Sequence, residues 1–186
     1  MPLLRAATAG DLEGIFAIAD DAVLHSTATM ETEPRPASER LDWLRAHDRA
    51  AYPVLVVTCE DEPGRVAGWG CLSPWSPRPG YAPTCEDTVY VAADRRGRGL
   101  GRLLLAELVA HARRTGRRWV IARISGDNAA SLRLHESLGF RTLGVMPRCG
   151  SKLGRLVDVH VLGCELLPVP EPGPSTGEAL PPDPAG

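Results

Sequence analysis

The residues best suited to chemistry fall within one short segment, Glu86–Arg102. A carboxylate, Glu86, precedes the β-prone run Thr88–Val91, and that run leads into a loop of arginines and glycines, followed by a leucine-rich stretch. A glycine loop at the start of a helix presents unpaired N–H groups and the positive end of the helix dipole, so it binds anions. Arg96 and Arg98 add charge suited to phosphate oxygens. The segment therefore predicts a phosphate site with a candidate general base just upstream.

The spacing of the glycines excludes two common nucleotide-binding motifs. A dinucleotide fingerprint needs G-x-G-x-x-G, whereas Gly97, Gly99 and Gly101 alternate. A P-loop needs lysine after its last glycine, and the only lysine of the chain is Lys152. What remains is Arg96-x-x-Gly99-x-Gly101. The alternative, an arginine-rich surface turn capped by glycine, is disfavoured by the position of the loop between a strand and a helix.

Length and composition limit the class of protein. The 186 residues fit one domain, which we place at residues 1–167, and the Pro/Gly-rich residues 168–186 are expected to form a disordered tail. No apolar run is long enough to cross a membrane, no signal peptide is visible, and the net charge of −2 argues against nucleic-acid binding. A cytoplasmic protein is therefore expected.

The five cysteines are widely spaced and form no C-x-x-C pair. A disulfide framework or a metal site is not expected, and we interpret the cysteines as reduced thiols in or near the core. Strands and helices are predicted to alternate irregularly, which indicates a three-layer α/β domain with a mixed sheet. The strands are expected at 3–5, 54–57, 66–72, 84–91, 119–125, 140–145 and 157–166.

Helix signals lie between these strands. Thr8 and Asp11 predict a capping box before the first helix, and Ser38 is expected to cap the second. A third helix follows the glycine loop. A fourth covers 129–138, beginning at Asp127 or Asn128 and ending at Gly139.

Several pieces, in order, carry a resemblance to a known family. They are Ser26-Thr27-Ala28-Thr29-Met30-Glu31, Pro74-Trp75-x-x-Arg78-x-x-Tyr81, Glu86-x-Thr88-Val89-Tyr90-Val91, the glycine loop, Asn128-x-x-Ser131-x-x-Leu134-His135-Glu136, and Lys152-x-Gly154-x-x-x-Asp158. Over residues 3–167 the chain resembles the phosphinothricin N-acetyltransferase branch of the GNAT superfamily, which also includes methionine sulfone and sulfoximine acetyltransferases. The resemblance implies the GNAT fold, a mixed and mostly antiparallel sheet flanked by helices on both faces.

The resemblance also implies roles. Glu86 would be the catalytic base and His135 the acid that protonates the leaving thiolate. The backbone of Val89, Tyr90 and Val91 would pair with the pantetheine arm of acetyl-CoA. The pyrophosphate would bind to Arg96, Gly97, Arg98, Gly99, Leu100, Gly101 and Arg102, and the far side of the arm to Asn128 and Ser131. Structural alternatives stay open: Glu86 as a solvated strand carboxylate, Asn128 as a helix cap alone, and His135 as a satisfied structural histidine.

For the acceptor pocket the resemblance implies Met30, Trp75, Arg78, Tyr81 and Lys152. Arg78 could equally be a surface arginine. Two departures from the family pattern affect this pocket. Met30 stands where relatives usually carry an aromatic residue, and the segment 152–158 lacks the family's histidine and tryptophan.

We expect an acetyl-CoA-dependent N-acetyltransferase of a small amino acid, acting by direct transfer without a metal, and the resemblance implies a homodimer. Direct transfer is expected because strand alternation turns Cys85 away from Glu86. Two alternatives are a GNAT enzyme that acts on peptide, protein or other amines, and an acyl-CoA-binding module without turnover.

Overall fold

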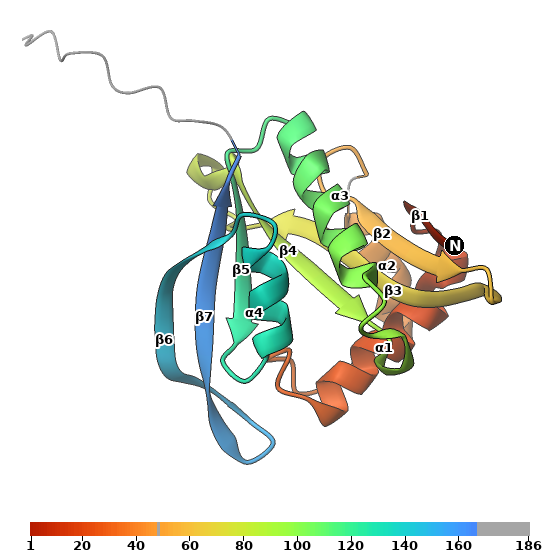
Figure 1. Cartoon of the computed structure of the whole chain (residues 1–186), viewed down its shortest axis with the longest axis horizontal. Helices are drawn as coiled ribbons and strands as arrows, with labels where there is room; N and C mark the ends of the chain where they lie inside the picture. The colour runs from red at the N-terminus through yellow and green to blue at the C-terminus, as the bar shows by residue number, and fades with distance from the viewer. Residues whose placement is uncertain (48, 167–186) are drawn as a thin grey trace, which may run out of the picture.

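One sheet organises the chain in this computed structural model, which describes residues 1–47 and 49–166. Within these residues seven strands follow the order β1-β2-β3-β4-β5-β7-β6 (Figure 1). Neighbouring strands are antiparallel except β4 and β5, which confirms the expected mixed, mostly antiparallel sheet. The strands are β1 (Pro2–Ala6), β2 (Val54–Cys59), β3 (Glu62–Pro74), β4 (Thr84–Val91), β5 (Trp119–Ser125), β6 (Arg141–Lys152) and β7 (Arg155–Glu165).

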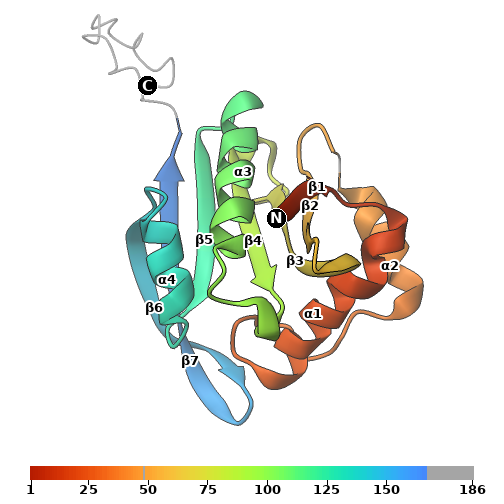
Figure 2. The same ribbon diagram turned by 45° about the vertical axis from the view of Figure 1, so that its right-hand side comes forward.

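The helices cover the sheet in two groups. These are α1 (Leu12–His25) with α2 (Ala37–Ala46), and α3 (Leu100–Arg114) with α4 (Ala129–Glu136). Figure 2 shows α3 in front of β4 and α4 near β6, while α1 and α2 lie together on the side of β3. None of the described helices is long and apolar enough to span a membrane. The predicted tail, residues 168–186, and the domain limit at 167 lie outside the described residues.

Strand β2 shows why both faces of the sheet are covered. Val54 and Val56 pack with α1 and with the aromatic rings of Phe16 and Trp69. The intervening Leu55 and Val57 pack instead against the leucines of α3. Successive strand side chains point to opposite faces, so a continuous apolar run indicates a strand buried on both sides.

The ends of the first two helices differ in how well the sequence predicted them. The capping box at Thr8 is confirmed: its backbone N–H and its Oγ1 each lie 2.8 Å from Asp11 Oδ2. The predicted cap at Ser38 is wrong, because α2 begins at Ala37 with Pro36 as its N-cap. The Glu39 N–H donates to the Pro36 carbonyl at 3.0 Å, so helical bonding has already begun where Ser38 would cap.

The last two strands are longer than predicted. Strand β6 runs to Lys152, beyond the predicted end at residue 145, through an irregularity in its pairing between Met146 and Gly150. Pro147, which has no N–H to donate to the ladder, lies within this irregularity. A two-residue turn, Leu153–Gly154, joins β6 to β7, and both residues have positive φ angles of 50° and 75°. Such turns match the twist of a hairpin but favour glycine or asparagine at their first position. Because Leu153 stands there, the sequence did not predict this turn.

The feature of the sheet that creates the site is the short contact between β4 and β5. Their parallel pairing covers only Thr84–Glu86 against Trp119–Ile121. Beyond Glu86 the rest of β4 pairs with β3, and no strand of the described residues pairs with the edge of β4 that faces β5. The splay of these two strands opens a cleft in the middle of the sheet.

Candidate active site

A cleft of about 1430 Å³ opens where β4 and β5 separate. One wall is formed by Glu86–Val91 of β4 and the glycine loop, and the other by residues 122–125 of β5 and the start of α4. The segment after α1 closes one end. Fourteen of the nineteen residues expected at the site line this cleft; the five that do not are Arg98, Trp75, Arg78, Tyr81 and Lys152.

The glycine loop leads directly into α3, as the sequence predicts. Gly97 and Gly99 have φ angles of 75° and 78°, a region that side chains rarely adopt, and Gly99 is the N-cap of α3. A Cβ built on either glycine would meet no atom within 4 Å, so the backbone there is open to the cleft. Gly101 is different, because a Cβ would lie 3.2 Å from Leu134 Cδ2 of α4. Its role is to let the two helices approach.

The arginines of the loop divide between the cleft and the opposite side. Arg96 lines the cleft, and its Nε donates to the Val91 carbonyl at 3.3 Å. Arg102 also lines it and donates to Ser137 Oγ at 2.7 Å. Arg98 instead turns away, with Nη1 3.7 Å from Asp61. Sequence reasoning missed Arg95, which is buried and holds the loop against the β2–β3 turn through Asp61 (2.5 Å) and Glu62 (2.8 Å).

Glu86 lies at the last paired position before the strands separate. Its side chain is 17% exposed and forms a bidentate ion pair with Arg123 of β5, at 2.5 Å to Nε and 2.9 Å to Nη2. The bond to Glu86 raises the pKa of Arg123. The guanidinium also lies over the ring of Trp75, 5.8 Å from its centre. Sequence reasoning missed Arg123, since no motif surrounds it.

His135 is buried, and each of its ring nitrogens faces an acceptor. Nε2 lies 3.0 Å from Asp87 Oδ2, and Nδ1 lies 2.8 Å from the Ser131 carbonyl oxygen. Burial lowers the pKa of His135, but the hydrogen bond and charge of Asp87 outweigh it, so the pKa is raised. This geometry is that of a charged imidazolium that ties α4 to β4 across the base of the cleft.

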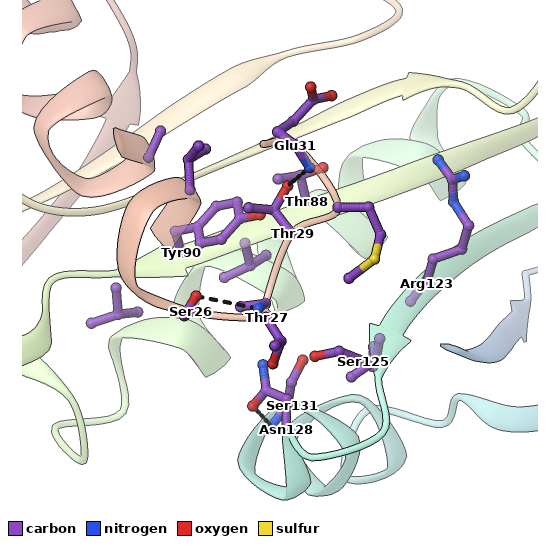
Figure 3. A pocket seen from close by; sticks show the side chains of 18 of the residues that line it. Ser26, Thr27, Thr29, Glu31, Thr88, Tyr90, Arg123, Ser125, Asn128 and Ser131 are labelled. Atoms are coloured by element: carbon purple, nitrogen blue, oxygen red, sulfur yellow. Dashed lines mark hydrogen bonds between the residues drawn. The ribbon is translucent and has the colours of Figure 1, made fainter. Parts of the chain in front are cut away.

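The wall at α4 gathers small polar side chains. Asn128 caps the helix by accepting from the Ser131 N–H at 3.1 Å, as predicted for a cap. Figure 3 shows Asn128, Ser131 and Ser125 at one end of the cleft, with Arg123 farther along β5. Ser125 was missed by sequence reasoning. It is buried and lines the cleft.

The residues expected to bind the acceptor are only partly brought together. Met30 lines the cleft and packs on the backbone of Gly150, where a Cβ would lie 2.5 Å from its sulfur. Lys152 is buried outside the cleft lining and donates to the Thr29 carbonyl at 2.7 Å, which fastens the Met30 loop. Arg78 and Tyr81 are exposed outside the lining, and the ring of Trp75, also outside it, lies against Arg123, which does line the cleft.

The cysteines are mostly remote from chemistry. Cys85 lies in the core, away from Glu86 as alternation predicts, and burial raises the pKa of both Cys85 and Cys71 to about 12. Cys149 departs from the expectation of core or near-core thiols, because it is exposed and lines the cleft. In the part of the chain that the structure describes, no cluster of His, Cys, Asp or Glu could hold a metal.

The split sheet, the glycine loop and the carboxylate in one cleft define an acetyltransferase of the GNAT class. The model of the Acetyltransferase (GNAT) family matches residues 20–140, and the chain belongs to this family.

Its relatives include amino-acid acetyltransferases. The chain is 41% identical to the L-methionine sulfoximine/L-methionine sulfone acetyltransferase of Pseudomonas paraeruginosa, over 89% of this chain and 95% of that protein. It is 36% identical to the phosphinothricin N-acetyltransferase of Streptomyces coelicolor, over 80% and 87%.

A solved structure supports the same relationship. The GNAT superfamily phosphinothricin acetyltransferase of Sinorhizobium meliloti, in complex with acetyl-CoA, superposes with a TM-score of 0.84 at 34% identity. The match covers 89% of this chain and 88% of that one.

Proposed function

We propose that this protein transfers the acetyl group of acetyl-CoA to the amine of a small α-amino acid. The observation that carries the proposal is the position of Glu86, at the point where β4 and β5 separate and in the same cleft as the glycine loop. The relatives named for methionine sulfone, methionine sulfoximine and phosphinothricin support an acceptor of that size.

The cleft suits acetyl-CoA on several grounds. The amides at Gly97 and Gly99 are uncovered at the start of α3, and Arg96 and Arg102 supply positive charge for a pyrophosphate. Among the described residues, the edge of β4 that faces β5 lacks a strand partner at Val89 and Val91, so an extended pantetheine arm can pair with it. On the other wall, Asn128, Ser131 and Ser125 offer polar contacts.

In the proposed reaction Glu86 takes a proton from the acceptor ammonium, directly or through water. The freed nitrogen lone pair forms a bond to the acetyl carbon, and the carbon–sulfur bond breaks with its electron pair on sulfur. The sulfur takes a proton from a water molecule, and the hydroxide that remains takes the second proton from the nitrogen, which leaves the neutral amide and the CoA thiol. We assign no proton transfer to His135, because both ring nitrogens already face Ser131 and Asp87. A thiolate leaves readily, since the pKa of a thiol is about 8.5.

The experiment that tests this function is release of CoA thiol from acetyl-CoA by the purified protein. The amine panel holds methionine sulfone, methionine sulfoximine, phosphinothricin, common amino acids, polyamines and a short peptide. Turnover with one of the amino acids is expected. Turnover only with peptide or polyamine would keep the chemistry and overturn the acceptor, and binding of acetyl-CoA without any turnover would favour a binding module.

The Glu86→Gln variant tests the base. We expect kcat to fall about 10²- to 10⁴-fold, because an amide cannot accept the ammonium proton. Acetyl-CoA affinity, measured by calorimetry, should stay within about threefold. The matched control is Glu107→Gln, an exposed glutamate of α3 paired with Arg114 outside the cleft. Full activity of Glu86→Gln would contradict the assignment.

We also propose that the protein forms a homodimer through the β6–β7 hairpin. Strand β6 is an edge of the sheet. Large apolar side chains are exposed on this hairpin, namely Leu143, Val145, Met146, Leu153 and Leu156. A second copy that covers them would remove an exposed apolar patch and an open strand edge together.

A further inference from the structure

The pair formed by Glu86 and Arg123 joins the two strands that separate to make the cleft. Glu86 is aligned with Ile121 of β5, two residues before Arg123. Alternation therefore turns Ile121 and Arg123 to the same face, and the guanidinium reaches back to the carboxylate through Nε and Nη2. The proposed base and a cation of the opposite wall thus lie side by side in the acceptor part of the cleft.

Arg123 can accept a second anionic partner. Its side chain is 56% exposed, lines the cleft, and in Figure 3 extends from β5 toward the side of the cleft where Glu31 lies. A guanidinium carries five N–H donors, and only Nε and Nη2 bind Glu86, so Nη1 retains its donors within the described structure. The arginine is therefore able to hold a carboxylate in a bidentate manner beside Glu86.

The charges around the pair leave this position available. Arg155, another cation of the cleft lining, is paired with Asp127 at 2.9 Å. Lys152 is buried against the Thr29 carbonyl and does not line the cleft. Arg123 is thus the cation next to the proposed base that can face an acceptor.

In an α-amino acid the ammonium and the carboxylate are bonded to the same carbon, the Cα, so the two charges lie close together. Its ammonium matches Glu86, and its carboxylate matches the guanidinium that lies 2.5 to 2.9 Å from Glu86. We infer that Arg123 binds the α-carboxylate of the acceptor and makes the enzyme selective for α-amino acids over simple amines. This inference rests on the proposed function and deepens it.

A static clamp on Glu86 is the rival explanation. An ion pair with a half-exposed arginine contributes little to stability, because water competes for both charges. The guanidinium can therefore release Glu86 for the acceptor carboxylate, or bind both carboxylates, at a small cost in free energy. If Arg123 only held Glu86 in place, its loss would change kcat/KM equally for amines with and without a carboxylate. The two explanations therefore predict different results.

The test compares methionine sulfone with 3-(methylsulfonyl)propan-1-amine, the same molecule without its carboxylate. In Arg123→Ala we expect kcat/KM for methionine sulfone to fall about 10- to 100-fold, as for loss of a charged bidentate contact. For the carboxylate-free amine, kcat/KM should change less than about threefold. Arg123→Lys should recover part of the selectivity, because lysine keeps the charge but not the fork.

Arg141→Ala is the matched control. Its guanidinium also lies over a tryptophan, 5.5 Å from the ring of Trp119, and near Glu165, but outside the cleft lining. Both substrates should be unaffected by this change. An equal loss or an equal gain with both substrates in Arg123→Ala would overturn the inference in favour of a clamp. Inactivity of the unaltered protein with every amine would instead count against the proposed function, and calorimetric binding of methionine sulfone would then test Arg123 independently of turnover.

Discussion

At the scale of single residues, His135 and Asp87 show how a charged pair can serve the site without touching the reaction. The imidazolium and the carboxylate are 5% and 2% exposed, and they connect α4 to the strand that carries Glu86. Removing one partner of a buried pair leaves the other charge unpaired in the low-dielectric interior of the protein, which strongly destabilises the folded state. The pair therefore fixes the distance between the two walls of the cleft.

The variant His135→Asn tests this structural role. We expect the free energy of unfolding to fall by about 3–5 kcal/mol, because Asp87 stays buried without its cation. Denaturant unfolding measures it. The matched control is His25→Asn, since His25 forms an exposed pair with Asp21 at 3.1 Å, and its loss should change stability by less than about 1 kcal/mol.

The same pair predicts a dependence of stability on pH. The pKa of His135 is raised in the folded protein, so its contribution is complete below about pH 6.5, the ordinary pKa of histidine, and is lost as pH rises through the folded value. Unfolding curves between pH 6 and 9 should show this loss, and His135→Asn should lack it. The kcat of the folded variant should stay within about threefold. A drop of about 10²-fold or more in a stable variant would return the general-acid role to His135.

At the scale of elements, replacing a glycine of the loop by alanine could act in two ways, by straining the backbone or by blocking the approach of a phosphate. Gly99 and Gly64 both have positive φ, 78° and 86°, and a Cβ on either would meet no atom within 4 Å. Only Gly99 lines the cleft. Alanine at either position is strained by about 1–2 kcal/mol, but only at Gly99 would its methyl group stand where a phosphate must approach the amides.

We therefore expect Gly99→Ala and Gly64→Ala to lose similar stability in thermal unfolding. Calorimetry should show the Kd for acetyl-CoA raised about tenfold or more in Gly99→Ala, and unchanged in Gly64→Ala. Equal affinities in the two variants would mean that the loop does not hold the phosphates.

At the scale of the whole molecule, the two edges of the sheet differ. The β6 edge carries the several exposed apolar side chains of the hairpin. On the β1 edge, the strand has one exposed large apolar residue among those described, Leu3. Val145→Lys places a charge in the proposed interface, and we expect a monomer by sedimentation equilibrium, since burying an unpaired charge is unfavourable. Leu3→Lys is the control and should leave a dimer. A monomeric unaltered protein would contradict the homodimer.

Much of this arrangement could be predicted from the chain itself. The limits of β4 and β5, the capping box at Thr8 and the open glycine loop before α3 follow from residues adjacent in sequence. Local rules govern them, because a strand, a cap or a positive φ depends on near neighbours. The hairpin turn at Leu153 was missed because its residue type disagrees with its conformation.

The charged partners of Glu86 and His135 were decided only by the tertiary structure. Arg123 is 37 positions from Glu86, and His135 is 48 positions from Asp87, so no local pattern links them. Lys152 likewise meets Thr29 across 123 positions. These contacts depend on the register of strands and on how a helix docks beside them, which sequence spacing does not encode. The sequence by itself determined which groups could bind phosphate and take a proton, whereas the tertiary structure decided which charges surround them, because ion pairs form between whatever side chains the fold brings within a few ångströms.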